Sequence, residues 1–173
     1  MAGWRTTSIQ NNSDKHDDYM TPKSAWESIR HLIPPDKVIW EAFYGDGNSG
    51  KYLTELGFQV IHEDVDFFQH NLGDIVVSNP PFSKTKEVLQ RLRQLEKPFI
   101  LILPALKIHT HYLSELFRDS PDPLTIIIPR KRIHYIKVVD GKPVEGWKPQ
   151  TSYESLFYCW KIPLARDITF LPA

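Results

Sequence analysis

The 173-residue sequence contains a single cysteine, Cys159, and only two methionines. One cysteine excludes an internal disulfide framework and every metal site built from several cysteines. No apolar run approaches the ~20 residues that a membrane-spanning helix requires. The first residues, Met1 to Asp18, are polar and lack the apolar stretch of a secretory signal. We therefore expect an intracellular protein, cytoplasmic or nuclear, that is neither secreted nor bound to a membrane.

The sequence also lacks a formal net charge, because 21 basic residues balance 21 acidic ones. This balance excludes a nucleic-acid clamp that is basic over its whole surface, although it permits a local basic patch. A chain of this length can bury about 70% of its unfolded surface, which suffices for one core and not for two full domains. We expect a flexible arm over residues 1–17, which show little periodicity, and a single domain over residues 18–173.

Short apolar runs alternate with amphipathic segments along this domain. Strands are predicted at 38–40, 58–61, 74–78, 99–103, 124–128 and 155–162. Helices are predicted from an N-cap at Thr21 and a first helical residue at Pro22 to 33, at 49–56, around 88–95 and at 112–117. Short buried strands that alternate with helices are typical of a mainly parallel sheet covered on both faces. The sequence thus predicts an α/β fold that binds ligands at the carboxyl ends of its strands.

A glycine-rich loop follows the first of these strands. Gly45, Gly47 and Gly50 match the G-x-G-x-x-G pattern of dinucleotide-binding folds, with Asp64 about 20 residues beyond Gly45. Residues 45–51 also nearly match the consensus of a phosphate-binding loop. However, Tyr52 occupies the position where that loop needs the magnesium-binding hydroxyl of a serine or threonine. Glycines allow close approach of the backbone to a ligand, and a carboxylate after the next strand can hold ribose hydroxyls. By itself, the loop could equally be a glycine-rich turn among ordinary surface acids.

The charged residues around this loop indicate which of these ligands it could bind. Residues 41–74 contain Lys51 as their one lysine or arginine and seven acids: Glu41, Asp46, Glu55, Glu63, Asp64, Asp66 and Asp74. This field disfavours the diphosphate of a dinucleotide and favours a cationic ligand. S-adenosylmethionine carries a sulfonium and an ammonium group, so we expect it as the cofactor. An NAD-dependent dehydrogenase is the alternative that the glycine pattern leaves open.

The most informative segment is Asn79-Pro80-Pro81-Phe82, which directly follows the strand predicted at 74–78. Proline has a fixed φ, lacks an N–H and pushes the preceding residue into extended conformations, so the segment is stiff. The side-chain oxygen of Asn79 and the carbonyl of Pro80 can accept both protons of a planar NH₂ group, on which Phe82 can stack. Methyl transfer to that nitrogen then requires positioning rather than a metal. A proline-rich turn capped by a core phenylalanine is the alternative.

Together these segments resemble class I S-adenosylmethionine-dependent amino-methyltransferases, especially the small phage-type and viral DNA N6-adenine methyltransferases. The resemblance covers about residues 18–162 and implies a Rossmann-like sandwich. It implies a catalytic motif made of Asn79, Pro80, Pro81 and Phe82. It also implies a cofactor site made of Tyr19, Thr21, Pro22, Glu41, Phe43, Gly45, Asp46, Gly47, Asp64, Asp66 and Phe67.

The sequence departs from the pattern of this family in two ways. Only one residue separates Asp64 from Asp66, where many relatives have a turn of helix, so Glu63, Asp64 and Asp66 are alternatives for the ribose-binding acid. No separate target-recognition domain is evident, which raises the possibility of a partner subunit for target recognition. Asparagine at the first catalytic position occurs in relatives that act on adenine, guanine or glutamine, so it does not fix the acceptor.

Basic residues gather in two segments despite the zero net charge. Residues 84–97 form one, and residues 130–148 form the other, with His134, Tyr135, Trp147 and Tyr153 interleaved. A basic stretch with aromatic side chains suits a flipped or single-stranded base. We expect substrate contacts from Lys84, Arg130, Lys131, Arg132 and Tyr135. A solvated charged hairpin is the alternative, and His109 and His111 are read as surface residues rather than metal ligands.

These patterns predict S-adenosylmethionine-dependent methyl transfer to the exocyclic N6 amine of adenine in nucleic acid, with DNA favoured over RNA. Methylation of guanine N2 in RNA or of a protein glutamine is the nearest alternative. A further alternative is an inactive methyltransferase-fold subunit that binds nucleic acid. No metal is expected in any of these cases.

Overall fold

The computed structural model describes residues 19–140, 142–146 and 154–172. The arm predicted over residues 1–17 lies outside these ranges, as do Trp147, Lys148 and Tyr153. The strands are β1 (Tyr19–Met20), β2 (Ile39–Trp40), β3 (Val60–Ile61), β4 (Ile75–Ser78), β5 (Phe99–Pro104), β6 (Leu124–Ile128), β7 (Ile136–Val139), β8 (Lys142–Pro143), β9 (Ser155–Trp160) and β10 (Ile168–Phe170). The α-helices are α1 (Lys23–Ile29), α2 (Asn48–Glu55), α3 (Thr85–Gln94) and α4 (His111–Phe117), and the 3₁₀ turns are η2 (Arg30–Leu32), η3 (Phe82–Lys84) and η4 (Ala105–His109).

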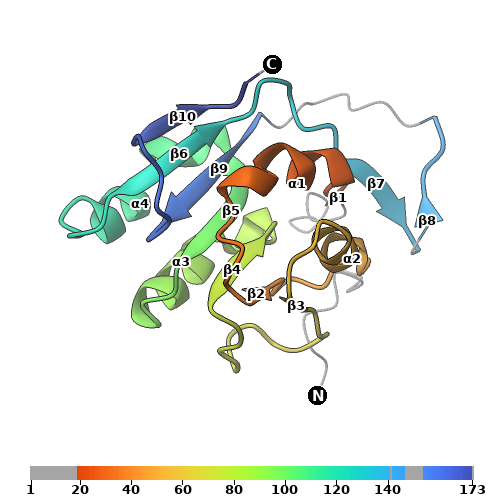
Figure 1. Cartoon of the computed structure of the whole chain (residues 1–173), viewed down its shortest axis with the longest axis horizontal. Coiled ribbons are helices and arrows are strands. Elements are labelled where there is room, and N and C mark those ends of the chain that lie inside the picture. The colour runs from red at the N-terminus through yellow and green to blue at the C-terminus, as the bar shows by residue number, and fades with distance from the viewer. Residues whose placement is uncertain (1–18, 141, 147–153, 173) are drawn as a thin grey trace.

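The larger of the two described sheets has seven strands in the order β10-β6-β9-β5-β4-β2-β3. All neighbouring strands run parallel except β9, which is antiparallel to both β5 and β6. Helices α1 and α2 cover one face and α3 and α4 cover the other (Figure 1). The predicted α/β class, a Rossmann-like sandwich with a mainly parallel sheet, is confirmed.

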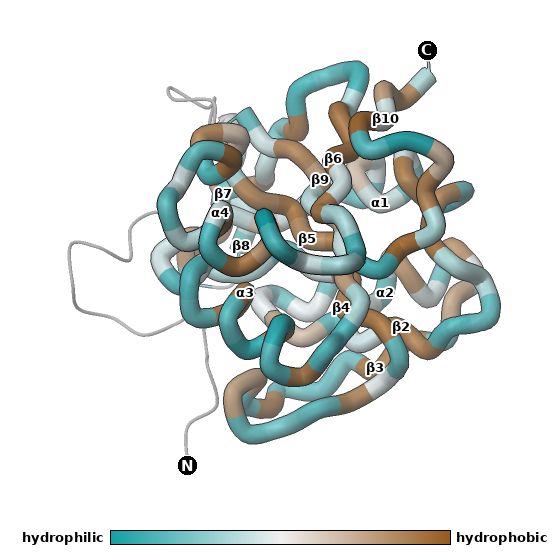
Figure 2. The backbone as a smooth tube through the Cα atoms, turned by 90° about the vertical axis from the view of Figure 1, so that its left-hand side faces the viewer, coloured by the Kyte–Doolittle hydropathy of each residue, from teal (hydrophilic) through white to brown (hydrophobic). Residues whose placement is uncertain are grey.

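The side chains of the central strands alternate between two cores. In β4, Ile75 and Val77 pack with α1 and α2, whereas Val76 packs with α3 and α4. In β5, Ile100 belongs to the first core and Leu101 to the second, and Figure 2 shows the hydrophobic runs of these strands through the middle of the molecule. Full burial of one such side chain contributes about 1.5–3 kcal/mol. Burial on both faces explains why these strands are continuous apolar runs in the sequence.

The chain reverses its progress across the sheet between β2 and β4. After β2 it passes through α2 to β3, but β4 then pairs on the other side of β2 and continues through α3 to β5. Because α2 and α3 pack on opposite faces, the loops that leave β2 and β4 diverge. Open α/β sheets bind ligands in the crevice at such a point, beyond the carboxyl ends of the strands. Both Glu41 and Asn79 begin these diverging loops.

A second, three-stranded antiparallel sheet has the order β1-β7-β8. Tyr19 pairs with Lys137 and Met20 with Ile136, so β7 holds the segment before α1 in place. The sequence did not predict this sheet, because strands of two residues carry no recognisable alternation. Its pairing determines where Tyr19 lies relative to the crevice.

The first helix begins later than predicted. It starts at Lys23, and Pro22 is its N-cap residue in an extended conformation (φ −71°, ψ 152°) without a side-chain capping bond. The predicted capping role of Thr21 is therefore wrong. Its hydroxyl oxygen is buried without a hydrogen-bond partner among the described residues, so it is available for another role.

Candidate active site

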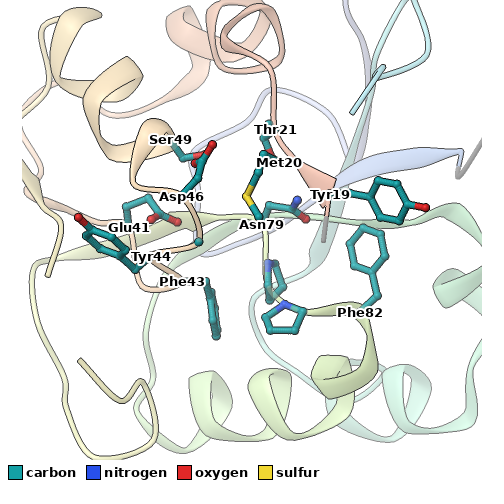
Figure 3. Close-up of a pocket in the computed structure, with 13 residues that line it drawn as sticks. Tyr19, Met20, Thr21, Glu41, Phe43, Tyr44, Asp46, Ser49, Asn79 and Phe82 are labelled. Carbon is teal, nitrogen blue, oxygen red and sulfur yellow. The ribbon is translucent and has the colours of Figure 1, made fainter. Parts of the chain in front are cut away.

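An open pocket of about 510 Å³, solvent-filled mouth included, lies at the crevice between β2 and β4. Three segments form it: the loop after β2, the loop after β4, and β1 with the residue that follows (Figure 3). The lining residues are Tyr19, Met20, Thr21, Glu41, Phe43, Tyr44, Gly45, Asp46, Ser49, Asn79, Pro80, Pro81 and Phe82. The structure thus brings together most of the catalytic and cofactor residues predicted from the sequence. Met20, Tyr44 and Ser49 are the lining residues that the sequence did not predict.

The glycine loop turns the backbone towards this pocket. Gly45 (φ 57°) and Gly47 (φ 81°) both adopt left-handed conformations, which favour glycine. The amide of Gly47 donates to the carbonyl of Tyr44 at 2.8 Å, closing a tight turn before α2. A Cβ on Gly45 would lie 3.1 Å from Sδ of Met20, so a side chain there would crowd the opposite wall. Gly45 lines the pocket, whereas Gly47, which was also predicted to bind the cofactor, is not among the lining residues and takes part in the turn.

Asp46 fixes the start of α2. One of its carboxylate oxygens accepts a hydrogen bond from the backbone amide of Asn48 at 2.9 Å, and the other accepts one from the side-chain amide of Asn48 at 2.7 Å. These bonds satisfy one of the free amides in the first turn of the helix. The carboxylate also lines the pocket, so Asp46 combines a structural role with a negative charge at the site.

The third glycine of the loop is required by packing. A Cβ on Gly50 would lie 2.2 Å from Cγ of His62, which follows β3 directly. The imidazole stacks on the Tyr44 ring with 4.6 Å between ring centroids and 14° between planes. His62 therefore supports the pocket-lining Tyr44 from below. The sequence did not single out this histidine; its place just before the acids Glu63 and Asp64 is the signal that could have found it.

Glu41 is the most deeply buried acid of the site, with 1% of the residue exposed. The hydroxyl of Ser78 donates to its Oε1, whereas its Oε2 has no hydrogen-bond partner within the described ranges. Nε2 of His62 lies 3.5 Å from Oε2 but is likewise not hydrogen-bonded. Burial raises the pKa of Glu41 to about 8, opposed by the bond from Ser78, and burial lowers the pKa of His62. Both groups are therefore mainly uncharged at neutral pH in the ligand-free protein.

The Asn79-Pro80-Pro81-Phe82 segment forms one wall of the pocket at the carboxyl end of β4. Oδ1 of Asn79 is buried and has no hydrogen-bond partner in the part of the chain that the structure describes. Phe82 begins η3, and the hydroxyl of Thr85 donates to its carbonyl at 2.9 Å. The Phe82 ring is half-buried against the core and also faces the pocket, with the Asn79 amide between it and Glu41 in Figure 3.

The segment before α1 closes the pocket from the other side. Tyr19 and Thr21 line it, and Thr21 is 3% exposed with its hydroxyl oxygen unpartnered. Figure 3 shows the rings of Tyr19 and Phe82 at one end of the pocket, away from Glu41 and Tyr44. Pro22, predicted to bind the cofactor, is not among the lining residues.

The acids after β3 do not line the pocket. Asp64 is exposed. Asp66 accepts a hydrogen bond from the backbone amide of Phe68 at 2.9 Å, which forms a local turn. Phe67 is buried and lies 4.9 Å, between ring centroids, from the pocket-lining Phe43. The predicted contacts of Asp64, Asp66 and Phe67 with a cofactor stay predictions.

The predicted substrate-binding residues fall into two groups. Arg130, Lys131 and Arg132 are exposed between β6 and β7, where Arg132 donates to Glu154 at 2.6 Å, and Lys84 is half-buried at the end of η3. Tyr135 is 8% exposed, and its hydroxyl donates to Ser155 at 2.6 Å. The ring of Tyr135 lies edge-on to Phe82 at 6.3 Å between centroids, so it packs behind a residue of the pocket wall. The predicted contacts of Tyr135 and of the four basic residues with substrate stay predictions.

Residues 19–140, 142–146 and 154–172 contain neither a metal-binding cluster nor a membrane-spanning helix. Within these ranges no group of three or more histidine, cysteine, aspartate or glutamate residues is placed to hold a metal ion. No helix in the same ranges combines the length and the apolar character needed to cross a bilayer.

No family model matches the chain, and no curated protein matches it. Among solved structures, the chain is similar to a crystal structure from Listeria monocytogenes described as a "putative class I S-adenosylmethionine-dependent methyltransferase". The two sequences are 13% identical, the match covers 96% of this chain and 68% of that one, and the TM-score is 0.49. The function of this chain is therefore inferred from its own pocket.

Proposed function

We propose that this protein is an S-adenosylmethionine-dependent methyltransferase that acts on the exocyclic N6 amine of adenine in DNA. One observation carries the proposal: the buried, unpartnered Oδ1 of Asn79, held at a pocket wall stiffened by two prolines. A buried acceptor without a partner costs about 1–3 kcal/mol, so its presence at a pocket indicates a ligand that donates hydrogen bonds. A planar NH₂ group is such a ligand.

The residues of the pocket fit a cationic cofactor. The thirteen lining residues include the acids Glu41 and Asp46 and no lysine, arginine or histidine. Oε2 of Glu41 and the hydroxyl of Thr21 are buried without partners, which leaves an acceptor on either side for a polar ligand. The left-handed Gly45 lines the same pocket and presents its backbone there without a Cβ. This charge pattern supports a sulfonium- and ammonium-bearing molecule over a diphosphate.

The acceptor amine is held by the opposite wall. Oδ1 of Asn79 and the carbonyl of Pro80 accept the two protons of the NH₂ group, and Phe82 stacks on the attached ring. Both prolines restrict the backbone, so little conformational entropy is lost when the amine binds. The amine lone pair is thereby presented to the pocket. As the new N–C bond forms, the S–C bond of the sulfonium breaks, the neutral thioether leaves, and one amine proton passes to water at the open mouth of the pocket.

The chemistry needs positioning more than strong acid–base groups. When bound, S-adenosylmethionine supplies an electrophilic methyl group on its sulfonium. Holding two reactants in a near-attack arrangement can lower a barrier by about 7–11 kcal/mol. The rings of Tyr19 and Phe82 line the end of the pocket in which we place the amine. The mainly uncharged Glu41 becomes a carboxylate counter-charge when a cation binds beside it.

The direct test incubates the protein with methyl-labelled S-adenosylmethionine and with separate pools of DNA, RNA and protein, followed by nucleoside and amino-acid analysis. We expect label in the DNA pool as N6-methyldeoxyadenosine. Asn79→Ala is the test variant. Asn71→Ala, which removes the same kind of side chain before the amino end of β4, is a matched control. Oδ1 of Asn71 accepts a hydrogen bond from Lys97, and neither residue lines the pocket.

The same experiment separates the alternatives. Label on guanine N2 of RNA or on glutamine of protein would keep the chemistry and replace the acceptor. Cofactor binding in calorimetry without label in any pool would indicate an inactive subunit. Absence of both binding and label would overturn the proposal altogether.

A further inference from the structure

The small β1-β7-β8 sheet carries a basic, apolar face that is continuous with the pocket. Residues opposite each other in an antiparallel pair project from the same face, as do alternate residues along one strand. Tyr19 is opposite Lys137, and Val139 is opposite Lys142. The amide of Val144 donates to the carbonyl of Lys137 at 3.0 Å, which extends this ladder by one pair. One face therefore presents Tyr19, Lys137, Val139, Lys142 and Val144; we call it the Tyr19 face.

The outer part of the Tyr19 face is accessible and positively charged. Val139 is 48% exposed and Val144 is 39% exposed, although both are apolar. Lys142 is exposed and Lys137 half-buried, and within the described residues neither forms an ion pair. Figure 1 shows β7 and β8 projecting beyond α1 and α2 at the edge of the molecule. Exposed valines between lysines indicate a surface that meets a partner which is both anionic and partly apolar.

We propose that the β7–β8 ribbon enters the major groove of a B-form DNA duplex and places the target adenine at the pocket. This inference rests on the proposed function, because the pocket takes the base that the duplex extrudes. The major groove is about 12 Å wide and admits a two-stranded ribbon. Beyond β1, the ribbon is two strands wide at Val138–Val139 and Lys142–Pro143.

The chemistry of the Tyr19 face fits this occupant. Its lysines contact phosphates, and its valines contact the C5 methyl groups of thymine, which are the apolar feature of the major groove. A-form RNA is excluded by the same geometry, since its major groove is too narrow for side chains to read. Asp140 and Glu145 are the acids of the ribbon, and both lie outside the paired strands. Tyr19 connects the groove-binding part to the pocket, since the same residue lines both.

The test measures binding of a fluorescent DNA duplex by anisotropy at several salt concentrations, without cofactor. Lys137→Gln/Lys142→Gln is expected to weaken binding about tenfold and to lower the slope of log affinity against log salt by about 1–2. The matched control is Lys37→Gln/Arg118→Gln, which removes the same charge from exposed positions before β2 and after α4. The control is expected to keep the slope of the unaltered protein.

A second variant tests groove contact independently of charge. The unaltered protein is expected to bind a duplex about three- to fourfold more weakly when deoxyuridine replaces thymine, because each methyl contact is lost. Val139→Ser/Val144→Ser should remove this difference while thermal unfolding stays unchanged. Equal binding of an RNA duplex of the same sequence or an unchanged salt slope in the lysine variant would each overturn the ribbon proposal. The two proposals can fail separately. If no methyl group is transferred but the ribbon variants lose DNA affinity as stated, the proposed function fails and DNA binding by the ribbon stands. If methyl transfer occurs and the lysine variant keeps the salt slope of the unaltered protein, only the ribbon proposal fails.

Discussion

Three buried oxygen atoms of the pocket, on Thr21, Glu41 and Asn79, lack hydrogen-bond partners among residues 19–140, 142–146 and 154–172. A folded protein leaves few such atoms without a partner, because each one costs free energy. Here they belong to three different segments that meet at one crevice. At the residue scale, the pocket is thus an incomplete hydrogen-bonding network that a bound ligand would complete.

Replacing Asn79 tests the acceptor half of this network. Asn79→Ala removes the side-chain oxygen that holds the target amine, and we expect turnover to fall by about 10²-fold or more. The cofactor dissociation constant should change less than about threefold, because Asn79 is assigned to the amine. Steady-state kinetics and calorimetry measure the two effects. Equal losses of turnover and cofactor affinity would instead assign Asn79 to the cofactor.

The raised pKa of Glu41 predicts that cofactor affinity depends on pH. A cation binds best beside the carboxylate form, so affinity for S-adenosylmethionine should rise with pH, by at most about tenfold per unit, and level off above about pH 8. Calorimetry from pH 6 to pH 9 measures this rise. Glu41→Gln should flatten it, and the comparison cancels the titration of the ligand's own amine.

The ligand-free protein should show the opposite trend. Because folding raises the pKa of Glu41 from its ordinary 4.5 to about 8, the neutral form is the one that folding favours. Relative to Glu41→Gln, stability is then full below about pH 4.5 and is lost as pH rises through about 8. Urea unfolding at several pH values checks this sign, and parallel stability curves for the two proteins would refute the raised pKa.

At the scale of elements, the packing of α2 against β3 determines the shape of the glycine loop. Gly50 lies in α2 where a Cβ would overlap the His62 imidazole, and that ring in turn stacks under Tyr44. Because Gly50 has no side chain, α2 can pack against His62 after β3, and His62 can stack on Tyr44 in the loop before α2. Such tight contacts between packed elements have little room to relax.

A double-mutant cycle tests this link. In most helices Gly→Ala is stabilising, because alanine is the better helix former. Gly50→Ala should instead destabilise the protein by about 1–3 kcal/mol through overpacking. In the background His62→Ala the same change should become neutral or stabilising, with coupling measured by urea unfolding. Lys51→Ala, at an exposed site of the same helix, is the control, and additive effects of the two substitutions would contradict the contact.

Parts of these elements could be predicted because their patterns are local. The runs at β5 and β6 and the glycines of the loop are recognisable without neighbours, since burial on both faces demands continuous apolar residues. The pairing of β1 with β7 could not be predicted, because it joins two-residue and four-residue segments far apart in the chain. The direction of β9 was equally inaccessible, since an apolar run reads the same in both directions.

The candidate site shows the same division. Asn79 and Gly45 follow strands closely, so the carboxyl edge of a parallel sheet brings them together. Tyr135 lies among basic residues in the sequence, which suggested a substrate contact, but in the fold its ring is buried edge-on against Phe82. His62 needs knowledge of the helix that crosses it, because its role depends on the missing Cβ of Gly50.

For the whole molecule, the crevice between β2 and β4 places the site at the carboxyl ends of the parallel strands. The opposite end of the sheet, where these strands have their amino ends, contributes to stability. This end carries a cluster in which Arg93 lies over the Trp160 ring at 4.5 Å and Lys161 at 4.7 Å. Trp160 is fully buried, and its indole N–H donates to Ser120 at 3.2 Å. These contacts consolidate the amino ends of the parallel strands and none of them lines the pocket.

Hydrogen exchange should reveal this difference between the two ends of the sheet. Adding S-adenosylmethionine is expected to slow exchange in residues 19–21, 41–49 and 79–82, which surround the pocket, by about tenfold or more at saturating ligand. Residues 118–123, at the opposite end, should keep their rates. Mass-spectrometric exchange of the full chain measures both, and protection centred on the opposite end would place the ligand elsewhere.

The most direct test of the account follows the methyl group itself. The protein is incubated with duplex DNA and S-adenosylmethionine whose methyl group carries deuterium. The DNA is then digested to nucleosides, and their masses are measured by mass spectrometry. The account predicts N6-methyldeoxyadenosine with a fully deuterated methyl group, formed by the unaltered protein and at least about 10²-fold more slowly by Asn79→Ala. Undeuterated DNA together with an intact cofactor, or equal yields from the two proteins, would contradict it.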